Sequence, residues 1–385
     1  MNVTAEVPLD GVCDPRFAAV RDAFRTNFTE RGEPGAAVAI AVGGHVVVDL
    51  WGGWSDRARM RPWARDTIVN IFSVGKALSA ICALRLVERS VLSLDAPIAD
   101  HWPEFAAAGK ETITLRQVLS HRAGLPALRD TLPDGAMLDW NLMTGALARE
   151  APWWAPGSAH GYHVNTFGYL VGETIRRANG KTLGTVLREQ IASPLGADVH
   201  IGLPESEHAR VADFLFPDGM PSPPKNMSGD LQRMRWNTYW NPPGFSGRGW
   251  VNKREWRMAE IPSTNGHGNA RGIARVYAAL ANGGTIDGVD ILADATLNEA
   301  TSEHSYGTDL VLERPTRFGL GFQLTHAERM LGPNPRTFGH FGAGGALGFC
   351  DPDAGVAFGY VTNDMGPRWQ NPRNSALMDA VYASL

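Results

Sequence analysis

The sequence predicts a mixed α+β fold in which one sheet is built from both ends of the chain and a mainly helical region is inserted between them. Strand-forming segments lie near both termini, whereas residues 95–262 contain few of them. The chain has 385 residues, 44% of them hydrophobic, and is long enough to bury a large core. We therefore expect a discontinuous α/β domain formed by residues 1–94 and 263–385, and an inserted, mainly helical domain between them.

Three elements are predicted in the N-terminal part of the chain. Residues 14–30 carry apolar side chains at helical spacing, with one face formed by Phe17, Val20, Phe24 and Phe28. Residues 36–51 contain two apolar runs separated by Gly43-Gly44, which is the pattern of a β-hairpin. The apolar run from residue 77 to 87 has no charge before Arg85, which predicts a helix buried nearly all round.

The remaining elements are predicted from shorter patterns. Helical spacing recurs at residues 115–120, 166–178, 183–191 and 271–281, and Asn282-Gly283-Gly284 ends the last of these helices. Strands are predicted at residues 318–324, 345–350 and 356–362, followed by a closing helix at 375–385. The strands at both ends are expected to share one sheet.

Composition and charge argue against several classes of partner. The formal net charge is −4 and no basic run occurs, so we expect no nucleic-acid partner. No apolar stretch approaches the length of a membrane span, and the N-terminus lacks the apolar segment of a signal peptide. Cys13, Cys82 and Cys350 are odd in number and lack metal-ligand spacing. We expect a cytoplasmic protein without a metal or cofactor; the sequence does not indicate its oligomeric state.

Ser73 and Lys76 are the first candidate catalytic residues. Three residues apart at the start of a helix, they share one face, and lysine beside serine can act as the base that makes a hydroxyl nucleophilic. The alternative is structural, with the serine as N-cap and the lysine as a solvated first-turn residue. Two observations argue against this structural alternative. A cation is unfavourable at a helix N-terminus, and the helix that follows has no polar face on which a solvated lysine could lie. A second S-x-x-K, from Ser222 to Lys225, contains two prolines that forbid a regular helix.

A serine nucleophile needs a second proton-handling group and a site for the oxyanion. Tyr162 follows a Pro-Gly loop and precedes a predicted helix, so it could relay a proton to the leaving group; the alternative is a half-buried core tyrosine. Residues 339–345 place glycines around His340 and Phe341. Such glycines let a substrate approach the backbone and leave N–H groups to face it, although a flexible hairpin is the alternative.

Together, these three motifs resemble those of the serine hydrolases of the β-lactamase and penicillin-binding-protein fold. The S-x-x-K motif is Ser73-Lys76, the tyrosine motif is Tyr162-His163-Val164, and the strand motif is His340-Phe341-Gly342. The similarity covers residues 36–365 and includes the segments 92–97, 119–125, 193–196 and 278–284. The resemblance implies an antiparallel sheet flanked by helices, with the active site where the sheet domain meets the inserted domain.

Within that family the chain most resembles the family VIII carboxylesterases, which keep the Ser-Lys-Tyr centre and cleave esters. In the strand motif of a β-lactamase, a lysine and a hydroxyl residue hold the substrate carboxylate. This chain has His340 and Phe341 at those two positions, and phenylalanine cannot donate a hydrogen bond. The expected lack of a signal peptide also separates the chain from cell-wall substrates. Val164 departs from the family pattern, since the tyrosine motif usually ends in asparagine or serine. Tyr239-Trp240-Asn241 matches that motif strictly but lacks the Pro-Gly lead-in and the following helix.

The resemblance implies a two-step acyl transfer in which Lys76 and Tyr162 handle the protons. The oxyanion hole is expected from the backbone N–H groups of Ser73 and Ala343, and the substrate is expected to be contacted by His340, Phe341, Gly342 and Trp240. For Lys76 to be neutral near pH 7, its pKa must be lowered by roughly 3 units, which corresponds to about 4 kcal/mol of free energy. A helix N-terminus supplies at most about 2 kcal/mol of this. The remainder must come from burial, or else a Tyr162 phenolate is the base. The sequence leaves both possibilities open.

We therefore expect a serine carboxylesterase that hydrolyses small, fairly apolar carboxylic esters through an acyl-enzyme on Ser73. Its partner would be a small-molecule ester, and no cofactor is implied. An amide, peptide or β-lactam hydrolase, or an acyltransferase, would use the same Ser-Lys-Tyr centre. A non-catalytic binding protein on this fold is disfavoured because the serine, the lysine and a candidate tyrosine are all present.

Overall fold

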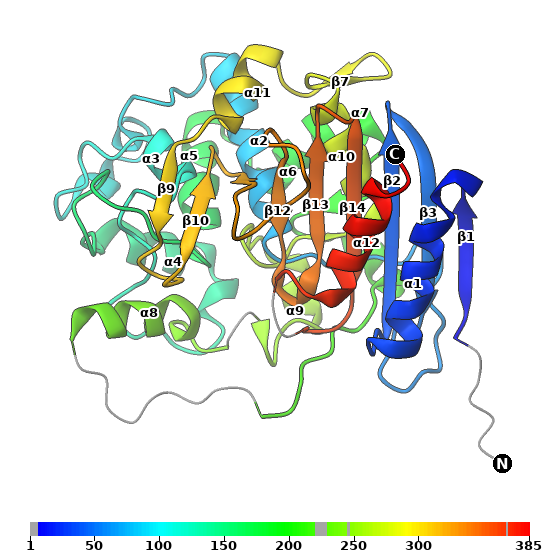
Figure 1. Ribbon diagram of the computed structural model, residues 1–385. Helices are drawn as coiled ribbons and strands as arrows, with labels where there is room; N and C mark the ends of the chain where they lie inside the picture. Colours follow the sequence, from blue (N-terminus) through cyan, green and yellow to red (C-terminus); the bar gives the residue numbers. More distant parts are fainter. Residues whose placement is uncertain (1–6, 220–228, 245–246, 367–368) are drawn as a thin grey trace.

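A nine-stranded antiparallel sheet forms the centre of the protein (Figure 1), as seen in a computed structural model that describes residues 7–219, 229–244, 247–366 and 369–385. The strand order is β1-β3-β2-β14-β13-β12-β11-β10-β9. Strand β2 (Gly35–Val42) pairs along its length with β14 (Val356–Thr362), which comes from the opposite end of the chain. The prediction of one sheet built from both termini is therefore confirmed.

The other strands of this sheet are β1 (Leu9–Cys13), β3 (His45–Gly53), β9 (Ser305–Thr308), β10 (Pro315–Phe318), β11 (Gln323–Leu324), β12 (Phe338–Phe341) and β13 (Leu347–Asp351). Two small sheets consist of β4 (Val69–Asn70), β6 (His267–Gly268) and β5 (Val199–His200), and of β7 (Thr285–Ile286) and β8 (Val289–Asp290). Strands of two residues are too short to show alternation, so the sequence did not predict them.

Helices cover both faces of the large sheet (Figure 1). On one face, alternate residues of β2 join a hydrophobic cluster with α1 (Ala18–Glu30) and α12 (Pro372–Tyr382). The intervening residues of β2 join a second cluster with α2 (Val74–Glu88) and α10 (Ala270–Ala281). The predicted burial of Phe17, Val20, Phe24 and Phe28 is confirmed, as is that of the apolar part of α2, where every residue from 74 to 84 is buried.

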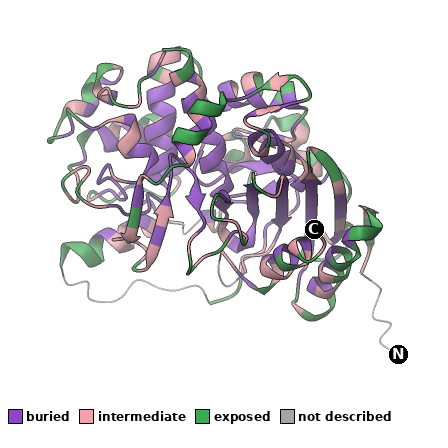
Figure 2. Ribbon diagram, turned by 45° about the horizontal axis from the view of Figure 1, so that its top comes forward, coloured by how far each residue is buried: buried purple, intermediate pink, exposed green. Residues whose placement is uncertain are grey.

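The middle of the chain is mainly helical, as predicted. Its helices are α3 (Leu115–Leu119), α4 (Trp140–Arg149), α5 (Thr166–Asn179), α6 (Leu183–Leu187), α7 (Ser193–Leu195), α8 (Asp230–Trp240) and α9 (Arg254–Met258); α11 (Asp294–Thr301) follows α10. Buried residues run from α2 into the sheet (Figure 2), and one hydrophobic cluster contains residues of both predicted domains. The division into two domains stays a prediction. In the described ranges, no helix has the length and apolar character needed to cross a membrane.

One predicted strand is wrong. Residues 318–324 form the ends of β10 and β11, which pair with each other in antiparallel fashion around a tight turn. Gly321 in this turn has φ +80°, and a Cβ on it would lie 2.2 Å from the Cβ of Ala80 in α2. The glycine therefore lets the turn approach the buried helix, a long-range contact that the local pattern does not reveal. The sequence also did not predict β1, β9, α4, α8 or α11.

Lys110 is buried, forms no ion pair with any described carboxylate and connects two segments of the inserted region. Its Nζ donates hydrogen bonds to the carbonyl oxygens of Ala107, Ala148 and Glu150, at 2.6, 3.0 and 2.5 Å. All three donors of the ammonium group are thereby used. The contact joins a loop before α3 to the end of α4.

Replacing Lys110 by methionine should lower the free energy of unfolding by about 2–4 kcal/mol, because three buried carbonyls lose their donor. Urea denaturation of the two proteins measures the difference. Lys181→Met is the matched control, since it removes an exposed ion pair with Glu189 and should change the free energy by at most about 1 kcal/mol. Equal losses in the two variants would contradict the role given to Lys110.

Candidate active site

Ser73 begins α2 directly after a strained turn. The Ile71 N–H donates to the carbonyl oxygen of Gly266 at 2.7 Å, which ties the chain to β6. Phe72 then adopts φ 47°, a region that is unfavourable for a residue with a side chain. Its ring packs edge-on against Phe214 at 4.7 Å. The Ser73 side chain makes no capping hydrogen bond, so the N-cap alternative does not account for its hydroxyl.

Lys76 is fully buried beside Ser73. Its Nζ lies 3.1 Å from Ser73 Oγ and donates hydrogen bonds to the carbonyl oxygens of Val164 at 2.7 Å and Ser263 at 3.1 Å. Within the described part of the chain, no carboxylate forms an ion pair with this amine. Burial lowers the pKa of Lys76 well below its usual value of 10.5. The lysine is therefore not a solvated first-turn residue, and burial favours its neutral form.

Tyr162 lies over the Lys76 amine. The lysine Nζ is 4.8 Å from the centre of the tyrosine ring. The ring is fully buried, and its hydroxyl lies near the Ser73 hydroxyl without reaching full hydrogen-bond geometry with any described residue. Burial raises the pKa of Tyr162, and the nearby Ser73 hydroxyl opposes that shift. The structure thus brings together the three residues that the motifs single out.

Asp309 fixes the loop that carries Tyr162. Its Oδ1 accepts hydrogen bonds from the backbone N–H groups of Tyr162 at 3.1 Å, Val311 at 2.8 Å and Leu312 at 2.9 Å. The tyrosine ring also stacks on Phe318, with ring centres 5.9 Å apart. The sequence analysis missed Asp309, because an isolated aspartate far along the chain carries no local signal.

The two residues after the tyrosine have structural tasks. His163 Nε2 accepts a hydrogen bond from the Leu125 N–H at 3.0 Å, so its Nδ1 carries the proton and donates to the carbonyl oxygen of Gly161 at 2.6 Å. Burial lowers the pKa of His163 to about 3, which keeps the ring neutral. Val164 contributes its carbonyl to Lys76. Any residue can supply this backbone group, so the missing asparagine or serine does not remove the contact.

The strict Y-x-N segment is placed differently. Tyr239 packs in the same small hydrophobic cluster as Tyr162 and is therefore close to the site. The Asn241 side chain, however, makes three hydrogen bonds to the backbone of loop 128–132. The Trp240 ring stacks on another tryptophan of α8, with ring centres 4.9 Å apart. The asparagine thus holds a loop, while the tyrosine beside the lysine amine is Tyr162.

The two side chains of the strand motif face opposite sides of the sheet, as alternation along β12 requires. The His340 Nδ1 donates to the Phe341 carbonyl oxygen at 2.7 Å, and its buried Nε2 has no partner among the described residues. Burial and the Lys76 amine lower the pKa of His340 to about 3. Phe341 is fully buried in the cluster formed with α1 and α12. We therefore correct the expectation that Phe341 contacts the substrate: its side chain belongs to the core.

Gly342 brings the end of β12 against the turn that carries the serine. A Cβ on Gly342 would lie 2.5 Å from the carbonyl oxygen of Ile71, two residues before Ser73. The Gly342 N–H donates to the Ala346 carbonyl oxygen at 2.6 Å. No described residue accepts a hydrogen bond from the backbone N–H of Ser73 or Ala343.

The turn after Ala343 is fixed by the start of α12. Gly344 and Gly345 adopt φ angles of 83° and 113°, which other residues rarely adopt. Their carbonyl oxygens accept hydrogen bonds from the Asn371 side chain at 3.2 Å and the Asn374 side chain at 2.9 Å. The same two asparagines form the capping box of α12. The last helix of the chain thus positions the turn beside the serine, a role that the sequence analysis did not find.

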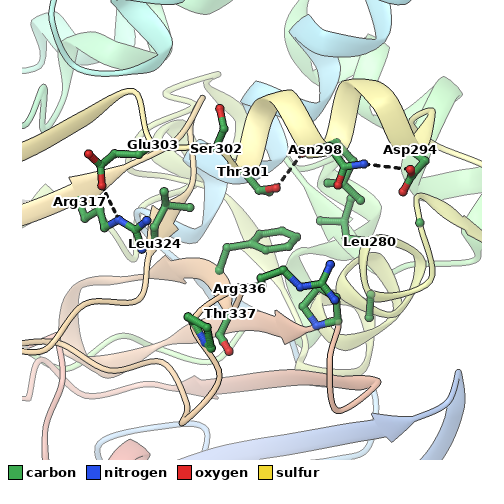
Figure 3. A pocket seen from close by; sticks show the side chains of 16 residues that line it. Leu280, Asp294, Asn298, Thr301, Ser302, Glu303, Arg317, Leu324, Arg336 and Thr337 are labelled. Atoms are coloured by element: carbon green, nitrogen blue, oxygen red, sulfur yellow. Dashed lines mark hydrogen bonds and ion pairs between the residues drawn. The ribbon is translucent and has the colours of Figure 1, made fainter.

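A cavity of about 460 Å³ lies elsewhere, between α11 and strands β11 and β12 (Figure 3). Its charged groups are paired: Arg317 contacts Glu303 at 2.8 Å, and the Asn298 amide donates to Asp294 at 2.9 Å. None of its described lining residues belongs to the Ser73 site. The cavity is therefore not the candidate active site.

Ser222 and Lys225, the second S-x-x-K, lie outside the described residues. His160 Nε2 is hydrogen-bonded to Thr316 Oγ1 at 2.9 Å. In the described ranges, no group of three or more His, Cys, Asp or Glu side chains is arranged to hold a metal ion.

Comparison with known sequences identifies the family of the chain and a relative named as an esterase and beta-lactamase. The family model described as Beta-lactamase matches residues 20–383. One relative is the esterase/beta-lactamase LipL of Mycobacterium tuberculosis, which is 36% identical over 92% of this chain and 82% of its own length. The match therefore extends over both parts of the sheet and the inserted region.

Comparison with solved structures agrees with this assignment. A penicillin-binding protein homolog from Caulobacter crescentus is 44% identical, with a TM-score of 0.90 over 98% of this chain and 100% of that one. A structure described as a family VIII carboxylesterase is 41% identical, with a TM-score of 0.91 over 98% of this chain and 100% of that one. The chain belongs to the Beta-lactamase family of serine hydrolases.

Proposed function

We propose that this protein is a serine carboxylesterase that hydrolyses small carboxylic esters through an acyl-enzyme on Ser73. The observation that carries the proposal is the Lys76 amine, which is buried, has no counter-ion among the described residues and lies 3.1 Å from Ser73 Oγ. The description of the family VIII carboxylesterase supports an ester as the substrate, and the name of LipL includes an esterase as well as a beta-lactamase. No observation favours a β-lactam hydrolase, a peptidase or an acyltransferase over an esterase.

Lys76 is the proposed base of the first step. A neutral lysine has two N–H bonds and one lone pair. The carbonyls of Val164 and Ser263 accept the two N–H bonds, which leaves the lone pair for the Ser73 hydroxyl. The serine oxygen then attacks the ester carbonyl while its proton passes to the lysine. A Tyr162 phenolate is the weaker candidate for the base, because burial raises the pKa of that tyrosine.

The tetrahedral oxyanion would lie between the backbone N–H groups of Ser73 and Ala343, which no described residue uses. As the bond to the alcohol oxygen breaks, Tyr162 gives its proton to that oxygen and takes one from the Lys76 ammonium. A water molecule then attacks the acyl-enzyme, again with Lys76 as the base, and releases the carboxylic acid. The substrate lies along His340 and Gly342 in this proposal.

The apolar character of the wall supports a preference for fairly apolar acyl groups. Tyr162, Val164 and Phe318 form one cluster beside the lysine amine, with Tyr239 packed against it. We also place the protein in the cytoplasm. Its three cysteines form no disulfide, which is typical of proteins from a reducing compartment.

Replacing Ser73 by alanine should abolish cleavage of p-nitrophenyl butyrate and covalent labelling by an organophosphonate, because the nucleophile is removed. The loss should be several orders of magnitude in kcat. Ser79→Ala is the matched control: that hydroxyl lies on the same helix but is hydrogen-bonded to the Gly75 carbonyl, so turnover should persist. Wild-type turnover by the Ser73 variant would overturn the proposal.

Tyr162→Phe removes one oxygen, so KM should change little while kcat falls by about 10²–10⁴-fold. Tyr239→Phe should have a mild effect, because that side chain packs against the cluster that contains Tyr162, whereas the Lys76 amine faces the Tyr162 ring. Steady-state kinetics of both variants measures the contrast. A large fall in kcat at Tyr239 with none at Tyr162 would show that the other tyrosine carries the proton.

The pH profile of kcat/KM should report the buried amine. Activity requires neutral Lys76, so kcat/KM should rise with pH through the lowered pKa of this lysine and reach its plateau well below pH 10.5. His163 and His340 have pKa values of about 3, so both rings are neutral at higher pH. They should therefore cause no change in kcat/KM near neutral pH. Continued increase of kcat/KM through pH 10.5 would contradict a neutral lysine base.

A further inference from the structure

The two carbonyl oxygens that accept hydrogen bonds from Lys76 belong to segments that a side-chain hydrogen bond joins. The amine lies between the carbonyl oxygens of Val164 at 2.7 Å and Ser263 at 3.1 Å. Each acceptor is followed by a polar residue, Asn165 in one segment and Thr264 in the other. The Thr264 hydroxyl donates a hydrogen bond to Asn165 Oδ1 at 2.9 Å. One contact therefore bridges the two segments directly beside the lysine.

Both ends of this bridge are anchored to other parts of the protein. Asn165 Nδ2 donates a hydrogen bond to the carbonyl oxygen of Thr238, in α8, at 3.1 Å. The Thr264 carbonyl oxygen accepts one from Asn70 Nδ2 at 2.9 Å. Asn70 Oδ1 in turn accepts one from Trp256 Nε1 at 2.9 Å. All these side chains are buried, and a buried network of satisfied hydrogen bonds holds its segments in one arrangement.

The separation of the two carbonyl oxygens matters because of what surrounds the Lys76 amine. Its third contact is the Ser73 hydroxyl, 3.1 Å away. The titratable side chains near the amine are those of Tyr162, His121, His163 and His340. Burial lowers the pKa of the three histidines and raises that of the tyrosine, so none of the four is charged at neutral pH. Within the described ranges, the amine is therefore oriented by the two carbonyls and not by a counter-ion.

We propose that Asn165 and Thr264 are positioning residues for the base of the reaction. Their hydrogen bond fixes the separation of the two carbonyl oxygens and thereby turns the lone pair of Lys76 toward the Ser73 hydroxyl. The inference rests on the proposed function, in which the lysine takes the serine proton. Without the bridge, the two segments separate and admit water to the amine. Water stabilises the ammonium form, so the pKa of Lys76 rises and a smaller fraction of the enzyme has a neutral base.

Thr264→Val tests the bridge, because it removes the hydroxyl from a side chain of nearly the same size. The Gly168 N–H still has Ser263 Oγ as its acceptor, at 2.6 Å in the unmodified protein, so the two segments should remain folded together. The quantity measured is the midpoint of the rise in kcat/KM for p-nitrophenyl butyrate with pH. This midpoint should move up by about 0.5 to 1 pH unit, and kcat/KM below it should fall roughly 3- to 10-fold, as expected for one hydrogen bond.

Two further variants separate positioning from stability. Thr264→Ser keeps the hydroxyl and should restore the midpoint of the wild-type protein. Thr174→Val is the matched control, since Thr174 is also buried and its hydroxyl donates to the Leu170 carbonyl oxygen within α5 at 2.8 Å. This control should lower the free energy of unfolding, measured by urea denaturation, by an amount similar to Thr264→Val while leaving the midpoint unchanged.

The pKa of Lys76 can also be measured without a substrate. The chain contains five lysines, so carbon-13 NMR of protein labelled at lysine Cε gives few signals. The signal of Lys76 is the one that is lost in Lys76→Met. Its titration midpoint should rise in Thr264→Val and return to the wild-type value in Thr264→Ser.

The outcomes distinguish this inference from the proposed function. An NMR midpoint that stays in place or falls in Thr264→Val overturns the positioning role while the esterase function stands. The role is equally wrong if Thr264→Ser behaves like Thr264→Val, because the hydroxyl is then not the cause. A rise in the NMR midpoint with an unchanged midpoint of kcat/KM means that the bridge holds the lysine but that the lysine is not the base. Ester cleavage that survives in Ser73→Ala overturns the function itself.

Discussion

The burial of one amine is the constraint on which the rest of the site depends. Lys76 can lie in the core only where backbone carbonyls accept its N–H bonds, and Val164 and Ser263 supply them from two distant segments. Those segments come close because glycines face them. A Cβ on Gly75 would lie 2.6 Å from the Pro262 carbonyl oxygen, and one on Gly168 would lie 2.5 Å from the Ser263 nitrogen. The glycines therefore allow the close packing that buries the lysine beside its two carbonyl acceptors.

The parts of the site that could be predicted are those with a local signal. Ser73 and Lys76 are one helical turn apart at the start of an apolar helix, so their spacing alone places them together. Phe341 was misplaced, because strand alternation turns the side chain next to His340 toward α1 and α12. Asp309 and Asn374 hold the site through contacts across the chain, and isolated polar residues in loops show no pattern from which such contacts follow. The turn inside residues 318–324 was missed for the same reason, since its glycine is explained only by α2.

The position of positive charge near the reaction centre differs between this protein and the β-lactamases whose motifs it resembles. The strand motif has lost its lysine, and the His340 ring that replaces it is neutral. Positive charge lies instead behind Tyr162, at Arg314 and Arg329, on the side where the tyrosine meets Trp369.

The sheet order has a consequence for synthesis of the chain on the ribosome. Strand β14 lies between β2 and β13, so the N-terminal hairpin exposes an unpaired apolar edge until almost the whole polypeptide has been made. Pairings between distant segments form slowly, and an open edge can associate with other chains in the meantime. Strand β2 therefore gains its second partner only after the C-terminal strands have emerged. Catalytic competence arises only at the end of translation, when α12 reaches the turn beside Ser73.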